Sequence, residues 1–403
     1  MRKLYAIVFK MLLFLLAVNL HFWGVGQTSV TFRINVVSPA YRATIKGATT
    51  IKLYAPGFKK VAASCWHQPD ANHTNTLGYD CRFATNLHPD KNGYATVNFP
   101  ANEYPHGPIT VLLHAWDATD SSLKHADTCY LQLYNQGGTP WQEGLANTPQ
   151  PPQAAGMHLV FADDFTKMPT ISRGGKGATY NSIKADGTEY GDAISASFGG
   201  PYDPFYQTDT YMRIRTQYRP DIKDSMGWNR KYTSGMLTSE RTDGTGVAPL
   251  FGYFECRMLC PNATGTWPAF WLLTQGSHVG GDSTSNEYDI IEGYGPHANG
   301  YWVTPHDWGF GKNYPSHWIK ADSIGGKADI AQTFHTYGCK VTPETTYYYF
   351  DNVMIFSHPA LEVTKKEGMQ FMINNNLGGG WPSDLSRYNG GADMYVDWVR
   401  VYQ

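Results

Sequence analysis

The 403-residue chain is poor in charge and has no excess of either sign. Charged residues make up 16% of it, below the roughly 25% that is usual in globular domains. The 32 Lys and Arg residues are balanced by 34 Asp and Glu residues, which gives a formal net charge of -2. A protein that binds the phosphates of a nucleic acid needs a basic excess, so the composition argues against a nucleic-acid partner.

Long apolar runs are also scarce. The first one follows three basic residues and extends from Met11 to Val18, which is shorter than the ~20 residues that span a bilayer. Together with the small residues Gly24 and Gly26, this pattern is typical of a secretory signal peptide, which we expect at residues 1–26. An uncleaved anchor is the alternative. We therefore expect a secreted or periplasmic protein without stable membrane insertion.

Cysteines are few, at positions 65, 81, 129, 256, 260 and 339. If all six pair in an oxidising compartment, about 15 connectivities are open, and the sequence does not select one. Cys256 and Cys260 look like a metal-binding pair, but they lie in an alternating segment in which four strand residues span about 13 Å. This separation is too long for one disulfide or one zinc ion. We expect two core cysteines, or a bond from one of them to Cys339.

Short alternating segments and aromatic residues are abundant instead; aromatics reach 14%. Between residues 28 and 136, segments such as TTIKLYA, YATVNF and ITVLLHAW are separated by Pro and Gly turns, which predicts an antiparallel β-sandwich. This part resembles a bacterial immunoglobulin-like domain. Residues 137–156 are rich in Gly, Pro and Gln and are expected to form a linker.

The remainder, residues 157–403, contains many further strand-like segments. No stretch longer than two turns has helical periodicity, and no repeat of fixed period is present. About 250 residues is within the usual range for one sandwich or barrel. We therefore predict a large all-β domain that follows a small β-sandwich.

The segment Asn286–Gly293, with the sequence NEYDIIEG, contains three acids. Strand alternation places Glu287 and Asp289 on one face and Glu292 on the other. A β-bulge at Ile290–Ile291 would return Glu292 to the face of Glu287. Because like charges on one strand face repel, such a row indicates shared protons or a use for the charge.

The predicted spacing of the outer two acids also carries chemical information. Side chains that lean inward over the shorter Asp289 bring the carboxyls of Glu287 and Glu292 to about 5–6 Å. That matches a retaining glycosidase, at about 5–5.5 Å, rather than an inverting one, at ~6.5–9.5 Å. A solvated strand edge with incidental acids, or a calcium cluster, are the alternatives from these residues alone.

The surrounding motifs resemble glycoside hydrolase family 16, whose members carry G-x-F-E-x-R, W-P-A-F-W and E-x-D-x-x-E strands in that order. Here they are GYFECR from Gly252, WPAFW from Trp267 and EYDIIE from Glu287, with DDF at Asp163 and VDWVRVYQ from Val396 as further matches. The resemblance covers residues 157–403. It implies a concanavalin-like β jelly-roll sandwich of two curved sheets with an open cleft.

The resemblance also implies residue roles. Glu287 matches the nucleophile, Glu292 the general acid/base and Asp289 the carboxylate that tunes the pair. Asp397 matches a position that helps to hold a structural calcium ion in several members, although no cofactor is required for catalysis. The residues expected to bind substrate are Trp267, Trp271, His306, Trp308, Asn376 and Trp381. Arg257 is expected to form a structural ion pair.

The predicted partner is thus a polysaccharide, and the predicted activity is that of a secreted, monomeric, endo-acting retaining β-glycanase. Lys and Arg are sparse between positions 267 and 310, which favours neutral β-1,3-glucan over an anionic β-galactan such as agar or carrageenan. The insertion at 275–285 leaves the substrate subfamily open. A transglycosylase shares the same catalytic residues, and a non-catalytic carbohydrate-binding protein is the alternative outside enzymes.

Overall fold

The computed structural model describes residues 32–67, 81–118, 124–140, 144–146, 148–275, 284–309, 314–324 and 328–403. The predicted signal peptide at 1–26 and most of the insertion at 275–285 lie outside the described residues. The regular structure is almost entirely β-strand, as predicted. No helix in the described part of the chain has the length and apolar character needed to cross a membrane.

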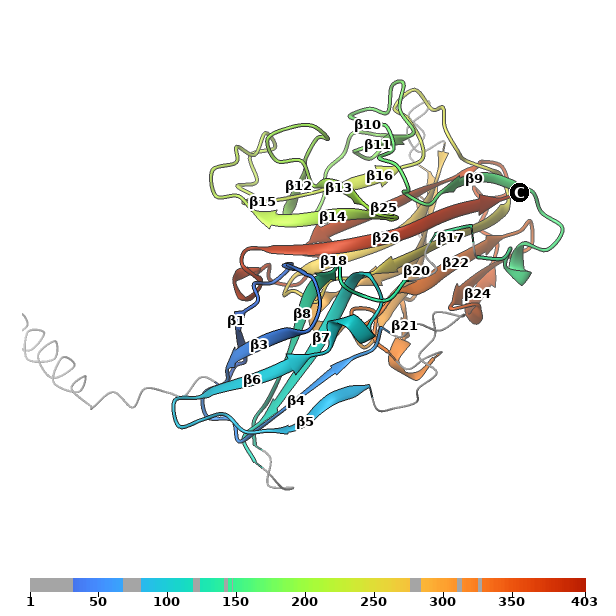
Figure 1. Ribbon diagram of the computed structural model, residues 1–403. Helices are drawn as coiled ribbons and strands as arrows, with labels where there is room; N and C mark the ends of the chain where they lie inside the picture. The colour runs from blue at the N-terminus through green and yellow to red at the C-terminus, as the bar shows by residue number, and fades with distance from the viewer. Residues whose placement is uncertain are drawn as a thin grey trace, which may run out of the picture.

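The N-terminal part is a sandwich of two sheets (Figure 1). Alternating residues such as Ile51, Leu53, Val97 and Val111 fill the space between them. A short 3-10 helix, η1 (Ala101–Glu103), precedes β7. The three-stranded sheet has the order β1 (Asn35–Ser38), β3 (Thr49–Tyr54) and β6 (Tyr94–Phe99), and the five-stranded sheet has the order β2 (Thr44–Ile45), β8 (Ala126–Asn135), β7 (Gly107–Trp116), β4 (Lys60–Cys65) and β5 (Arg82–Leu87).

The C-terminal part contains two larger sheets. The eight-stranded sheet has the order β10 (Ile171–Ser172), β11 (Tyr180–Asn181), β16 (Met236–Thr238), β25 (Met369–Leu377), β18 (Thr266–Thr274), β19 (Ser285–Gly293), β20 (Tyr301–Trp308) and β21 (His317–Ile319). The second sheet has the order β12 (Ala193–Ser195), β15 (Tyr232–Ser234), β14 (Tyr211–Tyr218), β26 (Gly391–Tyr402), β17 (Gly252–Leu259), β22 (His335–Val341), β23 (Thr345–Phe350) and β24 (Val353–Pro359), with β13 (Phe205–Thr208) beside β14 and β9 (Leu159–Asp163) beside β26. The 3-10 helices of this part are η2 (Pro152–Ala154), η4 (Gly295–His297), η5 (Ala321–Ser323) and η6 (Ser386–Tyr388).

Strand alternation explains how the two large sheets pack. Along β25, Met369, Phe371 and Ile373 enter the main apolar core, while the intervening Met372 and Asn374 belong to the other face. The core also takes Phe270 from β18 and Tyr288 from β19. The result is a two-sheet jelly roll, and the predicted all-β class is confirmed.

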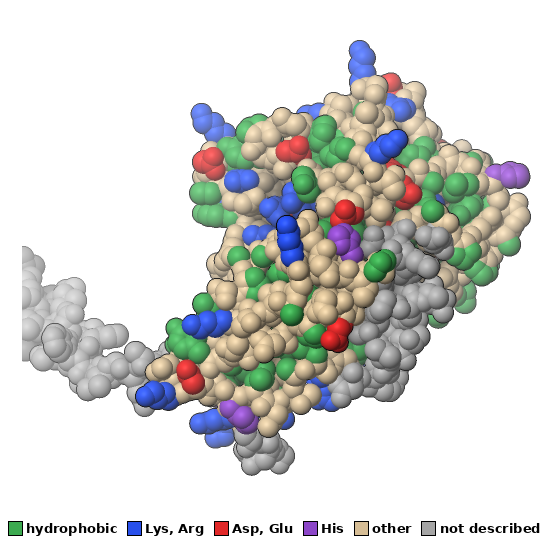
Figure 2. All heavy atoms as spheres, viewed as in Figure 1, with side chains coloured by type: hydrophobic (Ala, Val, Ile, Leu, Met, Phe, Trp, Pro, Cys, Tyr) green, Lys and Arg blue, Asp and Glu red, His purple; other side chains and the backbone are tan. Residues whose placement is uncertain are grey.

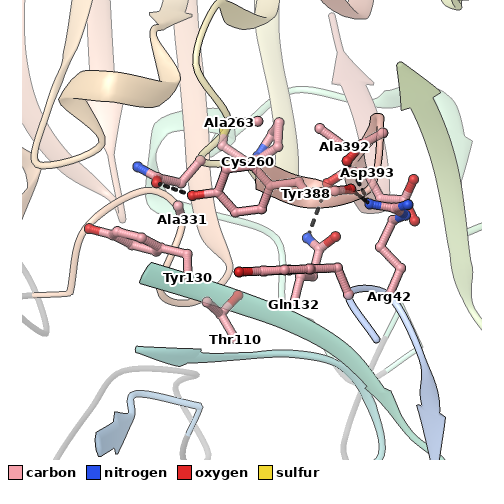
Figure 3. A pocket seen from close by; sticks show the side chains of 14 residues that line it. Arg42, Thr110, Tyr130, Gln132, Cys260, Ala263, Ala331, Tyr388, Ala392 and Asp393 are labelled. Carbon is pink, nitrogen blue, oxygen red and sulfur yellow. Dashed lines mark hydrogen bonds between the residues drawn. The ribbon is translucent and has the colours of Figure 1, made fainter. Parts of the chain in front are cut away.

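The two parts of the chain share a packed interface (Figure 3). Arg42 Nη1 donates to the carbonyl oxygens of Tyr388 and Gly391 at 2.5 and 2.6 Å. Arg387 and Asp127 form an ion pair at 2.5 Å, and the N-terminal apolar cluster extends into Leu377, Leu385 and Ala392. The N-terminal sandwich is therefore docked against the jelly roll at the end where β26 begins.

The segment predicted as a linker also lies against the jelly roll. Arg400 Nη1 donates to the carbonyl oxygen of Pro149 at 2.9 Å. Ala154 of η2 is fully buried and packs with Tyr253 and Tyr402. Its described residues from Gly144 onward follow the surface of the second sheet, so they tie the domains together.

The cysteines lie in the two cores. Cys256, Cys260 and Cys339 are buried thiols, which confirms the expectation of core cysteines for the first two and excludes the disulfide to Cys339. Burial raises the pKa of all three thiols. Cys65, at the end of β4, lies beside Cys81, which precedes β5, and the N–H of Cys65 donates to the carbonyl oxygen of Cys81 at 3.1 Å.

Candidate active site

The predicted bulge is present in β19. Against β18, Phe270 pairs with Ile291 and Trp271 pairs with Asp289, so Ile290 has no partner of its own. Against β20, the register also shifts between Asp289 and Glu292. Two residues of β19 thus occupy the length of one, which places Glu292 on the same face as Asp289.

The three acids meet in a pocket on the face of the eight-stranded sheet that is turned away from the core. Glu287, Asp289 and Glu292 all line it. Its other lining residues come from β18, from β25 and from the loop before β12, and are Lys184, Tyr190, Trp267, Ala269, Trp271 and Asn374. The row of acids predicted from the sequence is therefore a row that shares one cavity.

Glu287 has two polar neighbours on β20. Trp308 Nε1 donates to its Oε2 at 3.0 Å, and His306 Nε2 lies 3.9 Å from its Oε1. The His306 and Trp308 rings stack at 4.7 Å with an interplanar angle of 7°. Burial raises the pKa of Glu287, whereas the charge of His306 and the indole hydrogen bond act to lower it.

Asp289 is the most buried of the three, with a side chain 6% exposed. Its Oδ2 lies 3.0 Å from His306 Nε2. Burial, followed by the negative charges of Glu292 and Glu287, holds the pKa of Asp289 well above its usual range. The protonated form of Asp289 is therefore favoured more than that of a free aspartic acid, which limits the negative charge in the pocket.

Glu292 is held by neutral donors. Trp267 Nε1 and the Tyr294 hydroxyl donate to its Oε1 at 3.1 and 3.3 Å. Burial raises the pKa of this carboxyl, and the Trp267 hydrogen bond followed by the charge of His306 acts in the opposite direction. Glu292 is thus suited to hold a proton for transfer, while Glu287 lies closer to the imidazole.

Aromatic rings form the walls of the pocket. Trp271 donates from Nε1 to Asn374 Oδ1 at 2.8 Å, and the same oxygen accepts from the Tyr190 hydroxyl at 3.0 Å. Trp267 stacks with Tyr294 at 6.1 Å. Fixed aromatic walls around carboxyls suit a ligand with apolar C–H faces and polar edges, as a sugar has.

The aromatic surface continues beyond the pocket to Trp381. Its ring lies 6.4 Å from that of Tyr294 and 4.5 Å from that of His297, and Trp381 is 41% exposed. Trp381 therefore extends the wall made by Trp267 and Tyr294. Trp308 is also accessible, at 48% exposure.

Asn376, predicted as a substrate-binding residue, has a different environment. Its Nδ2 donates to the carbonyl of Tyr190 at 3.0 Å, and its Oδ1 accepts from the N–H of Leu377 at 2.8 Å. Because both ends of the amide bind backbone, Asn376 holds the loop that carries Tyr190. The pocket is lined instead by Asn374, two residues earlier on the same strand face.

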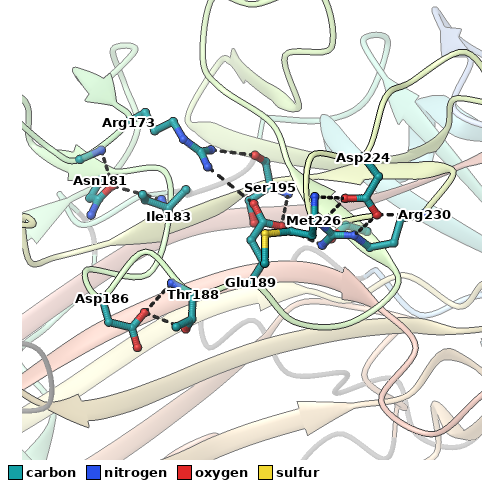
Figure 4. A network of polar contacts seen from close by, with 12 residues as sticks. Arg173, Asn181, Ile183, Asp186, Thr188, Glu189, Ser195, Asp224, Met226 and Arg230 are labelled. Atoms are coloured by element: carbon teal, nitrogen blue, oxygen red, sulfur yellow. Dashed lines mark hydrogen bonds and ion pairs between the residues drawn. The ribbon is translucent and has the colours of Figure 1, made fainter. Parts of the chain in front are cut away.

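The loop that supplies Lys184 and Tyr190 was not predicted, because nothing in its local sequence connects it to the catalytic strand. It is held by a network of charges (Figure 4). Arg230 Nη1 lies 2.8 Å from Glu189, and its Nε and Nη2 donate to the two oxygens of Asp224, each at 2.9 Å. The bidentate pairing orients Arg230, and its Nη1 then holds Glu189 of the loop beside the pocket.

Asp397, the residue expected to bind calcium, is 1% exposed and already has partners. Its Oδ2 lies 2.5 Å from Arg257 Nη1, and its Oδ1 accepts from the N–H of Gly144 at 3.1 Å. A calcium site needs about six to eight oxygen ligands and no cation beside them. The residues around Asp397 do not fit calcium, because the Arg257 guanidinium occupies the position of the cation; the structural ion pair predicted for Arg257 is confirmed.

One group in the described residues has metal-ligand geometry: Glu287, Asp289 and His306, whose ligand atoms all lie within 4.8 Å of one another. The same atoms are engaged with each other and with Trp308. In this cluster His306 Nε2 faces both carboxyls, at 3.0 Å from Asp289 and 3.9 Å from Glu287.

Sequence comparison finds a family model that matches most of the C-terminal part of the chain. Residues 208–400 match the model of the Glycosyl hydrolases family 16. The segment is 33% identical over 205 residues to endo-1,3-1,4-beta-glycanase EglC of Rhizobium meliloti (strain 1021), covering 50% of this chain and 40% of that protein. The chain is also 30% identical over 195 residues to a beta-glucanase of Rhodothermus marinus, covering 43% of this chain and 63% of that protein. The chain therefore spans less than two thirds of the length of these curated relatives.

Structural comparison supports the fold. The structure of SCLam, a non-specific endo-beta-1,3(4)-glucanase from family GH16, superposes with a TM-score of 0.50 at 20% sequence identity. The superposition covers 63% of this chain and 93% of SCLam. The uncovered part of this chain corresponds in size to the N-terminal sandwich and the segment that follows it.

The contacts of Asp397 predict that the stability of the protein does not depend on calcium. The midpoint of thermal unfolding, followed by circular dichroism, should be the same in excess EDTA and in excess calcium chloride. Arg257→Met, in contrast, should destabilise the protein by about 3–5 kcal/mol, because it leaves a buried carboxylate without its partner. A marked rise of the midpoint of the wild-type protein with calcium would contradict this assignment.

Proposed function

We propose that this protein, whose C-terminal domain matches glycosyl hydrolases family 16, is an exported endo-acting β-glucanase that cleaves β-1,3-glucan with retention of configuration. The observation that carries the proposal is the bulged strand, which puts Glu287, Asp289 and Glu292 in one pocket walled by indole and phenol rings. The glucanase activities of the relatives support β-glucan as the substrate class. The aromatic walls support a polymer of neutral sugars.

In the first step of the proposed reaction, Glu287 attacks the anomeric carbon of the bound sugar. The glycosidic C–O bond breaks, and the leaving oxygen takes the proton of Glu292. The positive charge of His306 and the Trp308 N–H favour the ionised form of Glu287 that this attack requires. The product is a glycosyl ester on Glu287 and a free sugar hydroxyl.

In the second step, ionised Glu292 takes a proton from water, and the resulting oxygen nucleophile attacks the same anomeric carbon. The ester bond to Glu287 breaks and Glu292 regains its proton, so the cycle closes with net hydrolysis. Asp289, between the two, is the group that holds a proton near Glu287 and limits the negative charge. Two inversions give overall retention.

Charge around the pocket favours a neutral substrate. Lys184 is a cation that lines the pocket, and its Nζ lies 3.3 Å from the carboxylate of Asp186. Figure 2, which shows another face of the molecule, has Lys and Arg side chains scattered among acidic and uncharged ones, in keeping with the low net charge of the chain. A sulfated β-galactan would need several unpaired cations in the cleft, so it is the second candidate substrate.

Two further alternatives concern the fate of the bound sugar. A transglycosylase would use the same residues and pass the glycosyl group to a sugar hydroxyl instead of water. A carbohydrate-binding protein without turnover would have no use for two carboxyls with raised pKa values in the same pocket. We favour hydrolysis.

For the N-terminal sandwich we propose an immunoglobulin-like module that acts as a fixed spacer or a weak sugar-binding unit. Its ion pair between Asp127 and Arg387 supports a fixed orientation relative to the catalytic domain. We further propose export through the segment 1–26 and a monomeric state.

The substrate assignment predicts the outcome of a digestion panel. The protein should cleave laminarin, a neutral β-1,3-glucan, into oligosaccharides of several sizes, because an open cleft allows internal attack. It should leave κ-carrageenan and agarose intact. Product sizes measured by high-performance anion-exchange chromatography check this, and products longer than an oligosaccharide substrate would indicate transglycosylation instead of hydrolysis.

The role assignment predicts different behaviour for variants at the two glutamates. Glu287→Ala and Glu292→Ala should each lower kcat on laminarin by at least about 10³-fold. Added azide should restore turnover in both, since it fits the space left by the carboxylate. In Glu287→Ala the azide attacks directly and gives a glycosyl azide of inverted configuration, whereas in Glu292→Ala it attacks the ester and gives a retained one. NMR of the products distinguishes the inverted from the retained glycosyl azide. If Glu287→Ala gave the retained azide and Glu292→Ala the inverted one, Glu292 would be the nucleophile and Glu287 the acid/base.

The environment of the acids predicts a pH effect for His306. The charge of His306 lowers the pKa of both Glu287 and Glu292, so His306→Asn should raise both. Ionisation of Glu287 then requires a higher pH and Glu292 stays protonated to a higher pH, which moves both limbs of the kcat/KM profile upward. His297→Asn is the control: this histidine lies 4.5 Å from the ring of Trp381 and is not among the groups that shift the pKa of the acids, so both limbs should stay in place.

A further inference from the structure

Two tryptophans lie next to the catalytic strand on the side opposite to the pocket walls. Trp302 of β20 pairs with Glu292 of β19, and Trp318 of β21 pairs with Trp302. Because directly paired residues in a sheet point to the same face, Glu292, Trp302 and Trp318 form one row across three strands.

The neighbours of this row confirm which face it occupies. Tyr301 and Val303, on either side of Trp302 in sequence, are both buried in the main core. Alternation therefore turns Trp302 to the open face of the sheet, where His306 lies further along the same strand. The next pair in the same two strands, Thr304 and Ser316, is polar and hydrogen-bonded at 2.9 Å.

The two indole rings form an exposed aromatic corner. Their centroids are 5.2 Å apart with an interplanar angle of 61°. Trp318 is 37% exposed and Trp302 is partly buried beneath it. An exposed indole offers a flat apolar face and an N–H donor at its edge, which suits a ligand with C–H faces and hydroxyl groups.

The position of the corner relates it to the catalytic pocket. Two strand spacings of ~4.8 Å separate β21 from β19, so Trp318 lies about 10 Å across the sheet from the catalytic strand. The pocket walls made by Trp267, Trp271 and Tyr190 lie on the other side of β19, on β18 and the loop before β12. A chain that crosses the sheet through the pocket would meet Trp302 and Trp318 beyond the bond that is cleaved.

We infer that Trp302 and Trp318 form a distal subsite that stacks a neutral sugar ring of the polysaccharide. The inference rests on the proposed function, because it requires a polymer that lies across the acids. The subsite adds affinity for long substrates and does not take part in the chemical steps. Its loss is therefore expected to raise KM for the polymer and to leave kcat nearly unchanged.

Binding to the catalytically inactive Glu287→Gln protein tests the inference. Isothermal titration calorimetry with laminarihexaose should show an affinity roughly 5- to 20-fold lower after Trp318→Ala is added, as expected for the loss of one stacking ring. Trp318→Phe keeps a ring and should recover most of the affinity. Laminaribiose is too short to reach both the pocket and the corner. It should bind with equal affinity to the Glu287→Gln protein with and without Trp318→Ala.

Tyr206→Ala is the matched control. Tyr206 is 55% exposed and lies on β13, beside β14 of the other sheet, so its loss should leave both affinities unchanged. Trp302→Phe repeats the test from the second ring while keeping the packing beneath Trp318. In the active protein, Trp318→Ala should raise KM for laminarin by a similar factor.

The outcomes separate the two proposals. Suppose that the Glu287→Gln protein binds laminarihexaose, and that adding Trp318→Ala changes neither this affinity nor the KM of the active protein for laminarin. The distal subsite is then wrong and the proposed function stands. If the wild-type protein neither binds nor cleaves laminarin, the proposed substrate is wrong, and the subsite for it is excluded as well.

Discussion

The extra residue in β19 is the constraint on which the active site depends. Strand geometry alone would divide the acids between the core and the cleft, and a charged Glu292 in the core would be strongly unfavourable. The bulge instead turns both Ile290 and Ile291 into the main core, where they are 1% and 0% exposed. Burial of each isoleucine contributes about 1.5–3 kcal/mol, so the apolar side of the strand holds the arrangement that the acidic side needs.

The pocket built on that bulge surrounds its acids mainly with neutral donors. Trp308 donates to Glu287, and Trp267 donates to Glu292. An indole N–H stabilises a carboxylate less than a guanidinium does, and burial raises the pKa of all three acids. Burial therefore favours retention of a proton on Glu292, the proposed general acid, while His306 and Trp308 counteract this effect at Glu287. The same indoles line the pocket, so each orients an acid and also offers the flat face that the proposed sugar ligand requires.

The rest of the molecule acts on the site through rigidity. Arg230, paired with Asp224 and Glu189, fixes the loop that forms one wall of the pocket. Behind the other sheet, Arg257 and Asp397 form a buried ion pair that connects β17 to β26 and receives the N–H of Gly144 from the interdomain segment. The N-terminal sandwich adds the ion pair between Asp127 and Arg387. These contacts restrict the relative movement of the pocket loop, the two large sheets and the N-terminal sandwich.

The sequence by itself determined the all-β class, the catalytic strand and the bulge, because period-2 alternation and the spacing of three acids are local properties of one segment. It also indicated that Trp267 and Trp271, which share a strand face, lie in the cleft. Only the tertiary structure decided which distant residues join them. Lys184 and Tyr190 reach the pocket from a loop about a hundred positions away in the chain, and Asn374 replaces Asn376 because the register between β25 and β18 sets which asparagine faces the cavity. The partners of Asp397 and the alignment of Trp318 with Glu292 likewise depend on strand pairing, which no local pattern encodes.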